Sequence, residues 1–329
     1  MAETLYPWLN KVWQQLLELK QQQRLPHALL LVTQNGLGAT NLSQHFLQAM
    51  LCQSPDEQGF ACNECSDCSL FLAHTHPDMH HITPPEGKEI IGVDQVRSLI
   101  DVMNERAHQG GFRLALVEPA DAMNKASANA LLKTLEEPGQ DTLLILVTNR
   151  VSSMLATVVS RCQTITVSAP SETDALDYVR EHHPDNESVD RLAVRLAQNR
   201  PLLALQLLQD GSIHQRMEFF AYLTGLSEGK LEPIKLVERS SKEQVLRYTD
   251  WLLELLLDVE RYQQGVSLQS LLCEDQKHLL LALSEVSAPS RYSWQNSLLE
   301  YKRLLISSSN VNPQLIVEDM MIRWIAFFR

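Results

Sequence analysis

Glycine is scarce in this sequence, at 12 of 329 residues, about half of the usual share of roughly 7%. Such a low content argues against many tight turns and favours a protein rich in helices. No run of about 18 apolar residues is present, so no membrane-spanning helix is expected. The opening residues Met1–Trp8 contain neither the basic nor the apolar stretch of a secretion signal. We therefore expect a protein of the reducing cytoplasm.

An excess of basic residues is also absent. The chain has 28 lysine and arginine residues against 40 aspartate and glutamate residues, a net charge of −12. The two parts 1–168 and 169–329 share this charge equally. Because Lys and Arg make most contacts to phosphate, this balance argues against a protein that coats DNA by itself.

The first half of the sequence alternates short apolar segments with helical patterns. Strands that are apolar on both faces and alternate with helices are typical of a parallel sheet covered on both sides. We therefore predict an α/β domain over residues 1–168. The expected strands are Ala28–Val32, Met79–Thr83, Leu114–Val117, Leu143–Val147 and Thr164–Val167.

The second half carries no strand signal. Residues Ala169–Ser171 indicate a hinge, and helices are expected from about Glu172 to Leu208 and from about His214 to the C-terminus. The last helix has the clearest start, because Asn312 can cap it and Pro313 suits the first helical position. The sequence thus predicts an α/β domain followed by an all-α region.

Four of the six cysteines are clustered. Cys52, Cys62, Cys65 and Cys68 follow the spacing C-x9-C-x2-C-x2-C. Thiolates this close together can share one ion, and four of them complete the tetrahedral shell that a structural Zn²⁺ prefers. Such a closed site leaves no position for water, so it predicts a structural zinc and no catalytic one.

Two other interpretations of this cluster stay open. An iron–sulfur cluster would match C-x2-C-x2-C, but the bacterial ferredoxin motif continues with a fourth cysteine and proline, and here Cys68 is followed by Ser69–Leu72. His74 or His76 could replace one cysteine as a ligand. The two remaining cysteines, Cys162 and Cys273, are expected to be small buried residues.

The segment after the first expected strand has the position of a phosphate-binding loop. Set against G-x-x-x-x-G-K-[ST], it keeps Gly38 and Thr40, but Thr33 replaces the first glycine and Ala39 the lysine. Another glycine, Gly36, lies two residues before Gly38. Without the lysine, no ammonium group reaches the β- and γ-phosphates. We expect this degenerate loop, Gly36, Gly38 and Thr40, to be empty of nucleotide.

The acidic pair of an ATPase is altered as well. After the strand Leu114–Val117, an ATPase of this class has Asp-Glu to hold Mg²⁺ and position water, whereas this sequence has Glu118-Pro119. Glu118 could hold a metal, but Pro119 cannot polarise water. Together with Ala39, these replacements argue against ATP hydrolysis by this chain.

Three further segments of the sequence relate the cysteine cluster and the altered phosphate loop to one protein family. The segment Asn124–Pro138 reads NKASANALLKTLEEP, the next expected strand is closed by Thr148–Arg150, and Ser160-Arg161-Cys162 follows. In this order and at these distances, the segments resemble the AAA+ clamp-loader family of bacterial DNA polymerase III. The four cysteines interrupt the domain where bacterial members carry a zinc module. Because the ATPase members gamma and tau keep the loop lysine and the Asp-Glu pair, this sequence resembles members that have lost them.

The resemblance implies an architecture and partners. It implies an AAA+ sheet domain over residues 1–168 with a zinc module at about 52–68, a small helical lid domain over 169–208, and a helical collar domain for oligomerisation over 209–329. It further implies a subunit of the DNA polymerase holoenzyme, a nucleotidyltransferase, without ATPase activity of its own. The implied partners are gamma/tau, delta and, through the complex, the sliding clamp and primed DNA, with no membrane.

The resemblance also assigns roles to single residues. Arg161, between Ser160 and Cys162, would be an arginine finger that enters the ATP site of the neighbouring subunit, where its planar guanidinium suits phosphate oxygens. A family sensor motif would fall near Asn199–Pro201, but its arginine position is Leu202, which fits a chain that binds no ATP. The alternative hypotheses are an active ATPase with a divergent loop and a zinc-ribbon protein that binds nucleic acid alone.

Overall fold

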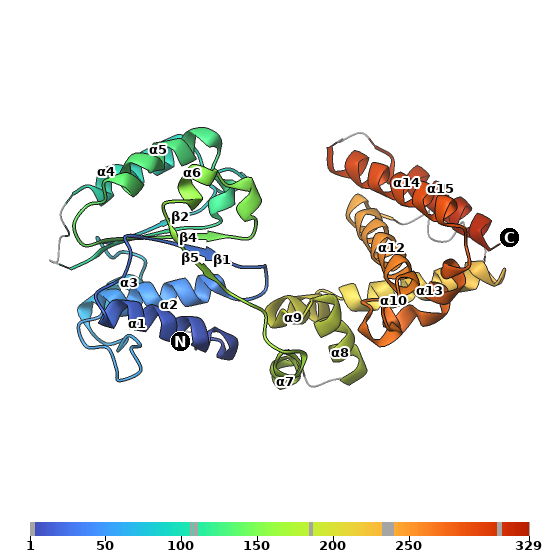
Figure 1. Cartoon of the computed structure of the whole chain (residues 1–329), viewed down its shortest axis with the longest axis horizontal. Helices are drawn as coiled ribbons and strands as arrows, with labels where there is room; N and C mark the ends of the chain where they lie inside the picture. Colours follow the sequence, from blue (N-terminus) through green and yellow to red (C-terminus); the bar gives the residue numbers. More distant parts are fainter. Residues whose placement is uncertain are drawn as a thin grey trace. The chain divides into compact units, whose positions relative to one another are not determined.

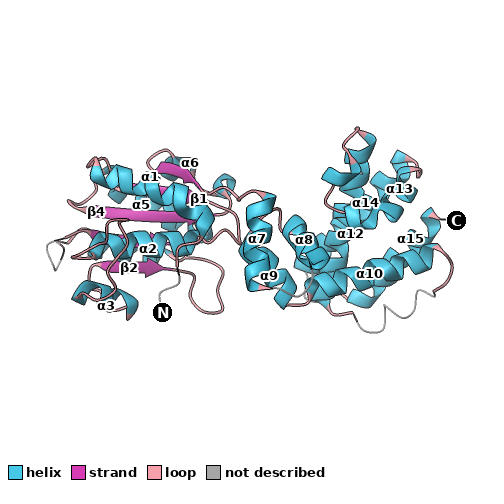
Figure 2. Cartoon of the chain, turned by 90° about the horizontal axis from the view of Figure 1, so that it is seen from below, coloured by secondary structure: helices cyan, strands magenta, loops and turns pink. Residues whose placement is uncertain are grey.

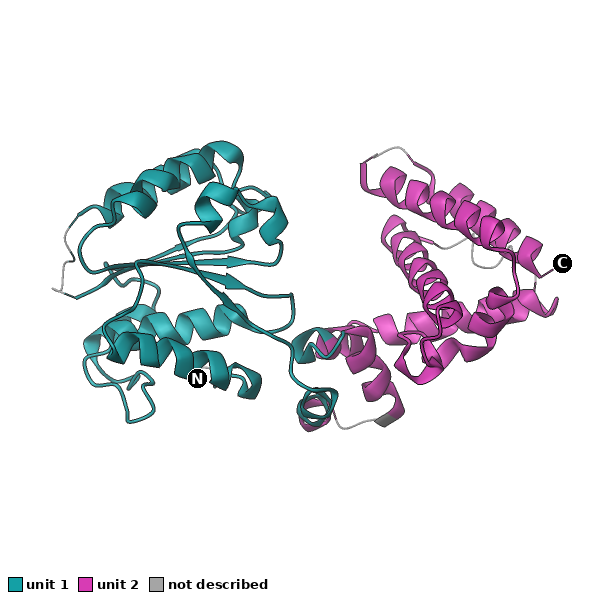
Figure 3. Ribbon diagram, viewed as in Figure 1, with its two compact units in different colours: residues 1–179, 198–203 teal, residues 180–197, 204–329 magenta. Residues whose placement is uncertain are grey.

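The computed structural model describes residues 4–105, 107, 111–183, 187–231, 240–307 and 311–328. The chain forms two compact units, one of residues 1–179 and 198–203 and the other of residues 180–197 and 204–329 (Figure 3). Every strand of the described residues lies in the first unit, and the second unit is helical (Figure 2). An α/β domain followed by an all-α region is therefore confirmed.

The first unit is built on a five-stranded parallel sheet with the order β2-β3-β4-β1-β5. In the register of its centre, Leu30 of β1 lies between Leu146 of β4 and Thr164 of β5. All five expected strands are present, and no strand end differs from its expected position by more than one residue. They are β1 (Ala28–Val32), β2 (Met79–Ile82), β3 (Arg113–Val117), β4 (Thr142–Thr148) and β5 (Gln163–Thr166).

Helices cover both faces of this sheet, with α1, α2 and α3 on one side and α4, α5 and α6 on the other (Figure 1). Alternate residues of each strand point to opposite faces. Leu29 and Leu31 accordingly pack with α1 and α2, while Leu30 packs with α4 and α5. The helices are α1 (Asn10–Gln21), α2 (Ala39–Leu51), α3 (Ser66–Leu72), α4 (Val93–Met103), α5 (Lys125–Glu136) and α6 (Ala156–Val159), with single 3-10 turns η1 (Pro7–Leu9), η2 (Ala120–Ala122) and η3 (Val151–Ser153).

The remaining helices follow the sheet in sequence. They are α7 (Glu172–His182), α8 (Glu187–Leu196), α9 (Pro201–Gln209), α10 (Ser212–Ser227), α12 (Lys242–Gln263), α13 (Lys277–Ser284), α14 (Ala288–Ser307) and α15 (Pro313–Phe327), with short turns η4 (Leu268–Ser270) and η5 (Glu274–Gln276). The start of α15 is as expected, because the Asn312 side chain accepts a hydrogen bond from the Gln314 N–H at 3.0 Å. None of the described helices has the length and apolar character needed to cross a bilayer.

The second unit has one continuous core, made by α10, α12, α13, α14 and α15. Trp324 of α15 is fully buried there, and its indole N–H donates to the Leu223 carbonyl and the Ser227 hydroxyl of α10. Ion pairs such as Asp250–Lys302, at 2.6 Å, join α12 to α14. These five helices are therefore held together by a shared core and by paired polar groups.

Candidate functional site

The degenerate phosphate loop connects the end of β1 to α2. Gly36 and Gly38 have φ values of +89° and +75°, in the left-handed region that favours glycine. The Leu202 N–H donates to the Gly36 carbonyl at 3.2 Å. A Cβ atom built on Gly36 would lie 2.6 Å from the Leu203 Cβ. The start of α9, in the same compact unit, therefore lies directly against this loop.

Aromatic side chains cover the other glycine. A Cβ atom on Gly38 would lie 2.4 Å from Cδ2 of Tyr6. The ring of Tyr6 stacks on Trp8 with centroids 5.1 Å apart, and Tyr178 of α7 meets the Trp8 ring edge-on at 4.8 Å. The Trp8 indole N–H donates to the Leu37 carbonyl at 2.8 Å. The chain's own side chains thus occupy the surroundings of the loop.

The two groups that could hold Mg²⁺ bind each other. The Thr40 hydroxyl, at the start of α2, donates to Oε1 of Glu118 at 2.5 Å. Burial raises the pKa of Glu118, and the hydrogen bond from Thr40 opposes this shift. The Glu118 side chain, which would coordinate a metal, is therefore hydrogen-bonded to the Thr40 hydroxyl of the loop.

Polar residues at the ends of β3 and β4 are also paired within the chain. Oδ1 of Asp121 accepts the Thr148 hydroxyl at 2.9 Å, and Oδ2 accepts the Arg150 Nε–H at 3.3 Å. The Asn149 amide donates to the Asn35 side chain of the loop at 2.6 Å. Asp121 was missed in the sequence, although an acidic residue just beyond the carboxyl end of a parallel strand is a signal that could have identified it.

Arg161 lies between α6 and β5, on the surface of the first unit. Its Nη1 donates to the Thr157 carbonyl at 2.9 Å and its Nη2 to Oε1 of Glu136 at 2.6 Å. About a third of the Arg161 side chain is exposed (35%). Ser160 donates its hydroxyl to the same Thr157 carbonyl, while burial raises the pKa of Cys162 to about 11. The arginine is thus held at the end of a short helix by two hydrogen bonds, with about a third of its side chain exposed.

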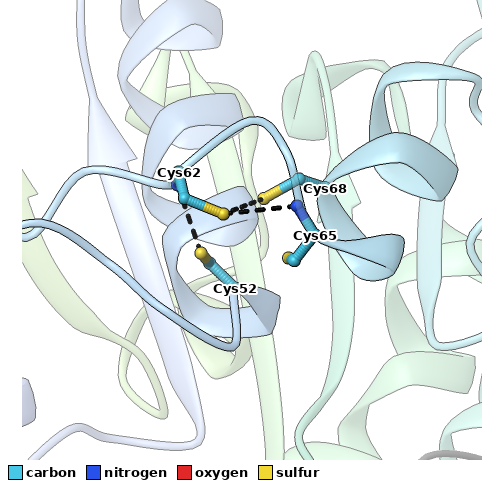
Figure 4. Close-up of side chains that lie close together, drawn as sticks. All are labelled: Cys52, Cys62, Cys65 and Cys68. Atoms are coloured by element: carbon cyan, nitrogen blue, oxygen red, sulfur yellow. Dashed lines mark hydrogen bonds between the residues drawn. The ribbon is translucent and has the colours of Figure 1, made fainter.

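The four clustered cysteines come together in space (Figure 4). The sulfur atoms of Cys52, Cys62, Cys65 and Cys68 all lie within 4.8 Å of one another. Backbone N–H groups already point at them, with Cys62 N–H donating to the Cys52 sulfur at 3.2 Å and Cys65 N–H to the Cys62 sulfur at 3.4 Å. Four thiol groups at this spacing, with amides directed at sulfur, fit a tetrahedral thiolate-preferring ion.

The thiols differ in acidity. Backbone N–H groups, that of Gln53 above all, lower the pKa of Cys65 to about 6, and Glu64 N–H in the same way lowers the pKa of Cys62. Burial raises the pKa of Cys52 and of Cys68. Backbone N–H groups thus favour the thiolate at Cys62 and Cys65, whereas burial favours the protonated thiol at Cys52 and Cys68, where an ion must displace a proton.

His74 and His76, the two histidines considered as metal ligands, lie outside the cysteine cluster. Nδ1 of His76 accepts the Asp78 N–H at 3.1 Å, and its Nε2 faces Oδ1 of Asp67 at 3.5 Å. Oδ2 of Asp67 accepts the Gln53 amide at 2.9 Å. His74 is exposed, and among the described residues neither histidine belongs to the cysteine cluster. His76 therefore links the cysteine segment to the start of β2.

Comparisons with known proteins cover nearly the whole chain. Residues 8–171 match a family described as DNA polymerase III, delta subunit, and residues 210–326 match its C-terminal family. The chain is 33% identical over 327 residues to the DNA polymerase III subunit delta' of Yersinia pestis, covering 97% of this chain and 95% of that one. For the subunit delta' of Pseudomonas aeruginosa the identity is 32% over 323 residues, covering 97% of each. A gamma subunit-related protein of DNA polymerase III from Thermotoga maritima aligns with 20% identity and a TM-score of 0.47, covering 96% of this chain and all of that one.

Proposed function

The chain belongs to the family of DNA polymerase III delta' subunits, and on that premise we propose that it is a clamp-loader subunit that hydrolyses no ATP. It supplies Arg161 to the ATP site of a neighbouring subunit. Its partners are the gamma/tau ATPases and delta, and the complex loads the sliding clamp on primed DNA. The observation that carries this proposal is a contrast. The chain's own nucleotide loop is covered by its own side chains, whereas Arg161 is held partly exposed at the surface.

Several independent features support the loss of nucleotide binding. Ala39 provides no ammonium group for a triphosphate. The loop glycines, which would let phosphate approach the backbone, face Leu203 and Tyr6. Thr40 and Glu118, the two groups that would share Mg²⁺, share a hydrogen bond. A nucleotide would have to displace all of these contacts at once.

Titration with a fluorescent ATP analogue tests this part of the proposal. We expect the purified chain to give no saturable signal at micromolar nucleotide. We expect the same of Ala39→Lys, because a lysine restores the charge but leaves the packing of Leu203 and Tyr6 on the glycines. An intact ATPase subunit of the same complex serves as the positive control. Micromolar affinity of the unaltered chain would instead support an active ATPase with a divergent loop.

The position of Arg161 supports its role as a finger. A guanidinium presents five N–H groups in a rigid fork, and the two contacts to Thr157 and Glu136 leave N–H groups for a further acceptor. The residue follows α6 directly, so its backbone is held by the short helix and by β5. With its backbone held in place and N–H groups of its guanidinium still available, Arg161 can donate hydrogen bonds to phosphate oxygens of a nucleotide in a neighbouring subunit.

The C-terminal helices supply a surface for assembly, and we assign residues 209–329 to the collar, 169–208 to the lid and 1–168 to the AAA+ domain. Exposed apolar residues recur at intervals of seven on α14 (Tyr292, Leu299, Ile306) and on α15 (Leu315, Ile322), each at least half exposed. A seven-residue spacing places side chains on one face of a helix, as in helices that pack against partner helices. The partner proposed for these faces is the equivalent helical domain of another subunit.

Substitutions on α14 test the collar. We expect Leu299→Asp together with Ile306→Asp to weaken assembly at least about tenfold, since burying one such side chain contributes roughly 1.5–3 kcal/mol. Analytical ultracentrifugation or gel filtration with the partner subunits measures the change. Ile90→Asp is the matched control, because Ile90 is also an exposed isoleucine but lies in the first unit. Equal assembly of the double variant and the control would contradict the assignment.

The cysteine cluster completes the proposal. Cys52, Cys62, Cys65 and Cys68 are proposed to hold one structural Zn²⁺, which supplies four metal–sulfur bonds and no reaction. These residues lie after α2 and at the start of α3, and the segment between them contains little regular structure. A metal would therefore substitute for the core that such a short segment cannot build.

A further inference from the structure

The carboxylate of Glu136 lies against the guanidinium of Arg161. Oε1 of Glu136 accepts from Nη2 of Arg161 at 2.6 Å, and the two side chains are 51% and 35% exposed. Glu136 ends α5 and Arg161 follows α6, so two separate helices bring the pair together. Nothing in the sequence pattern assigned a role to Glu136 beyond its place near a helix end.

The second contact of the Arg161 guanidinium is a hydrogen bond to a neutral carbonyl group and no ion pair. Nη1 of Arg161 donates to the Thr157 carbonyl, in the last turn of α6. Carbonyl groups at a helix C-terminus carry partial negative charge and lack partners within the helix, so a cation is favourable there. This contact orients the arginine and leaves its full positive charge in place, whereas the Glu136 carboxylate neutralises that charge.

A triphosphate would compete with Glu136. Phosphate oxygens form charge-assisted hydrogen bonds to a guanidinium over the same distance range as a carboxylate. The Glu136 carboxylate would also repel a triphosphate that approaches Arg161. The ion pair is solvent-exposed and therefore weak, so a ligand of higher charge can displace the carboxylate.

We propose that the Glu136 carboxylate pairs with Arg161 while the subunit is separate. In the assembled complex, Arg161 leaves Glu136 and binds the triphosphate of the neighbouring subunit. Glu136 is thus the counter-charge of Arg161. This inference rests on the proposed function, because it requires that Arg161 acts in trans. Glu136 is a positioning residue that acts through Arg161 and touches no nucleotide. It sets how strongly the neighbouring site binds ATP.

The test uses complexes assembled from full-length subunits, with ATP hydrolysis measured over a range of ATP concentrations. We expect Glu136→Gln to lower the KM for ATP by up to about fivefold, the factor that corresponds to the ~1 kcal/mol upper end for an exposed ion pair. The kcat should change less than about twofold, because the finger itself is intact. Glu137→Gln is the matched control. It removes the same charge one residue away, and no ion pair of Glu137 is present in the described part of the chain.

The double variant with Arg161→Ala and Glu136→Gln tests the role of Glu136 separately from the role of Arg161. If Glu136 acts through Arg161, adding Glu136→Gln to Arg161→Ala leaves the KM of Arg161→Ala unchanged. The counter-charge role would be contradicted if Glu136→Gln had the same KM as Glu137→Gln, or a kcat as low as that of Arg161→Ala. Neither result would contradict the role of Arg161 as an arginine finger. If Arg161→Ala by itself leaves ATP turnover unchanged, the proposed function fails first.

Discussion

Replacing Arg161 by alanine is expected to slow ATP hydrolysis at the neighbouring site by about a thousandfold, the lower end of the 10³–10⁵ that arginine fingers contribute in known cases. The guanidinium would neutralise charge that develops on the transferred phosphoryl group, and alanine leaves that charge without a partner. Single-turnover hydrolysis in a complex reconstituted from full-length subunits is the appropriate measurement.

Two further variants sharpen this experiment. Arg161→Lys keeps the charge but loses the planar fork, so its rate should lie between those of alanine and arginine. Arg97→Ala removes another surface arginine, with 68% of its side chain exposed, from α4, on the sheet face that also carries α5 and α6, and should leave the rate unchanged. An Arg161→Ala complex that assembles fully and hydrolyses ATP at the normal rate would rule out the finger.

Loss of a single cluster cysteine is expected to abolish metal binding. The purified chain should contain on the order of one zinc ion, and Cys65→Ser should contain almost none, because a structural site needs all four ligands. Amide exchange should then become faster in the segment 52–72, whose order the metal would provide. Cys162→Ala is the matched control, since Cys162 lies outside the cluster. A metal-free native chain, or full metal content in Cys65→Ser, would contradict the site.

The same site predicts a dependence on pH. Zinc binds thiolates, and burial raises the pKa of Cys52 and Cys68 while Cys65 has a pKa of about 6. Protons therefore compete with the metal, most strongly at Cys52 and Cys68, and zinc affinity should fall as the pH is lowered. Chelator competition at about pH 6 and pH 8 measures the difference. Equal affinity at the two values would show that the ligands are not these thiols.

The strands could be predicted because their signal is local. Buried strands such as Ala28–Val32 and Thr142–Thr148 are apolar on both faces, and the pattern is read within five to seven neighbouring residues. The edge strand Gln163–Thr166 was displaced by one residue in the prediction, because only one of its residues is buried and the apolar pattern is correspondingly weak. The cap of α15 was predicted correctly because Asn312 and Gln314 are two residues apart.

The residues that sequence reasoning missed all depend on distant contacts. Asp121 binds Thr148 from 27 residues away, and Glu136 binds Arg161 from 25 residues away. Tyr6 and Leu203 reach the loop from the N-terminal segment and from α9. Helical or strand periodicity carries no information about such pairs, so these contacts could not be predicted, although the place of Asp121 after a parallel strand marked the residue itself.

The amino-acid sequence by itself determined which chemical groups this protein possesses. It provided four cysteines at a spacing that lets them share an ion, a loop without lysine, and an arginine between a serine and a cysteine. Only the tertiary structure decided what those groups meet, namely the leucine and tyrosine side chains that cover the loop and the carboxylate beside Arg161. The physical reason is that covalent spacing restricts neighbours within a few residues, whereas contacts between distant segments arise when the sheet and its helices pack together.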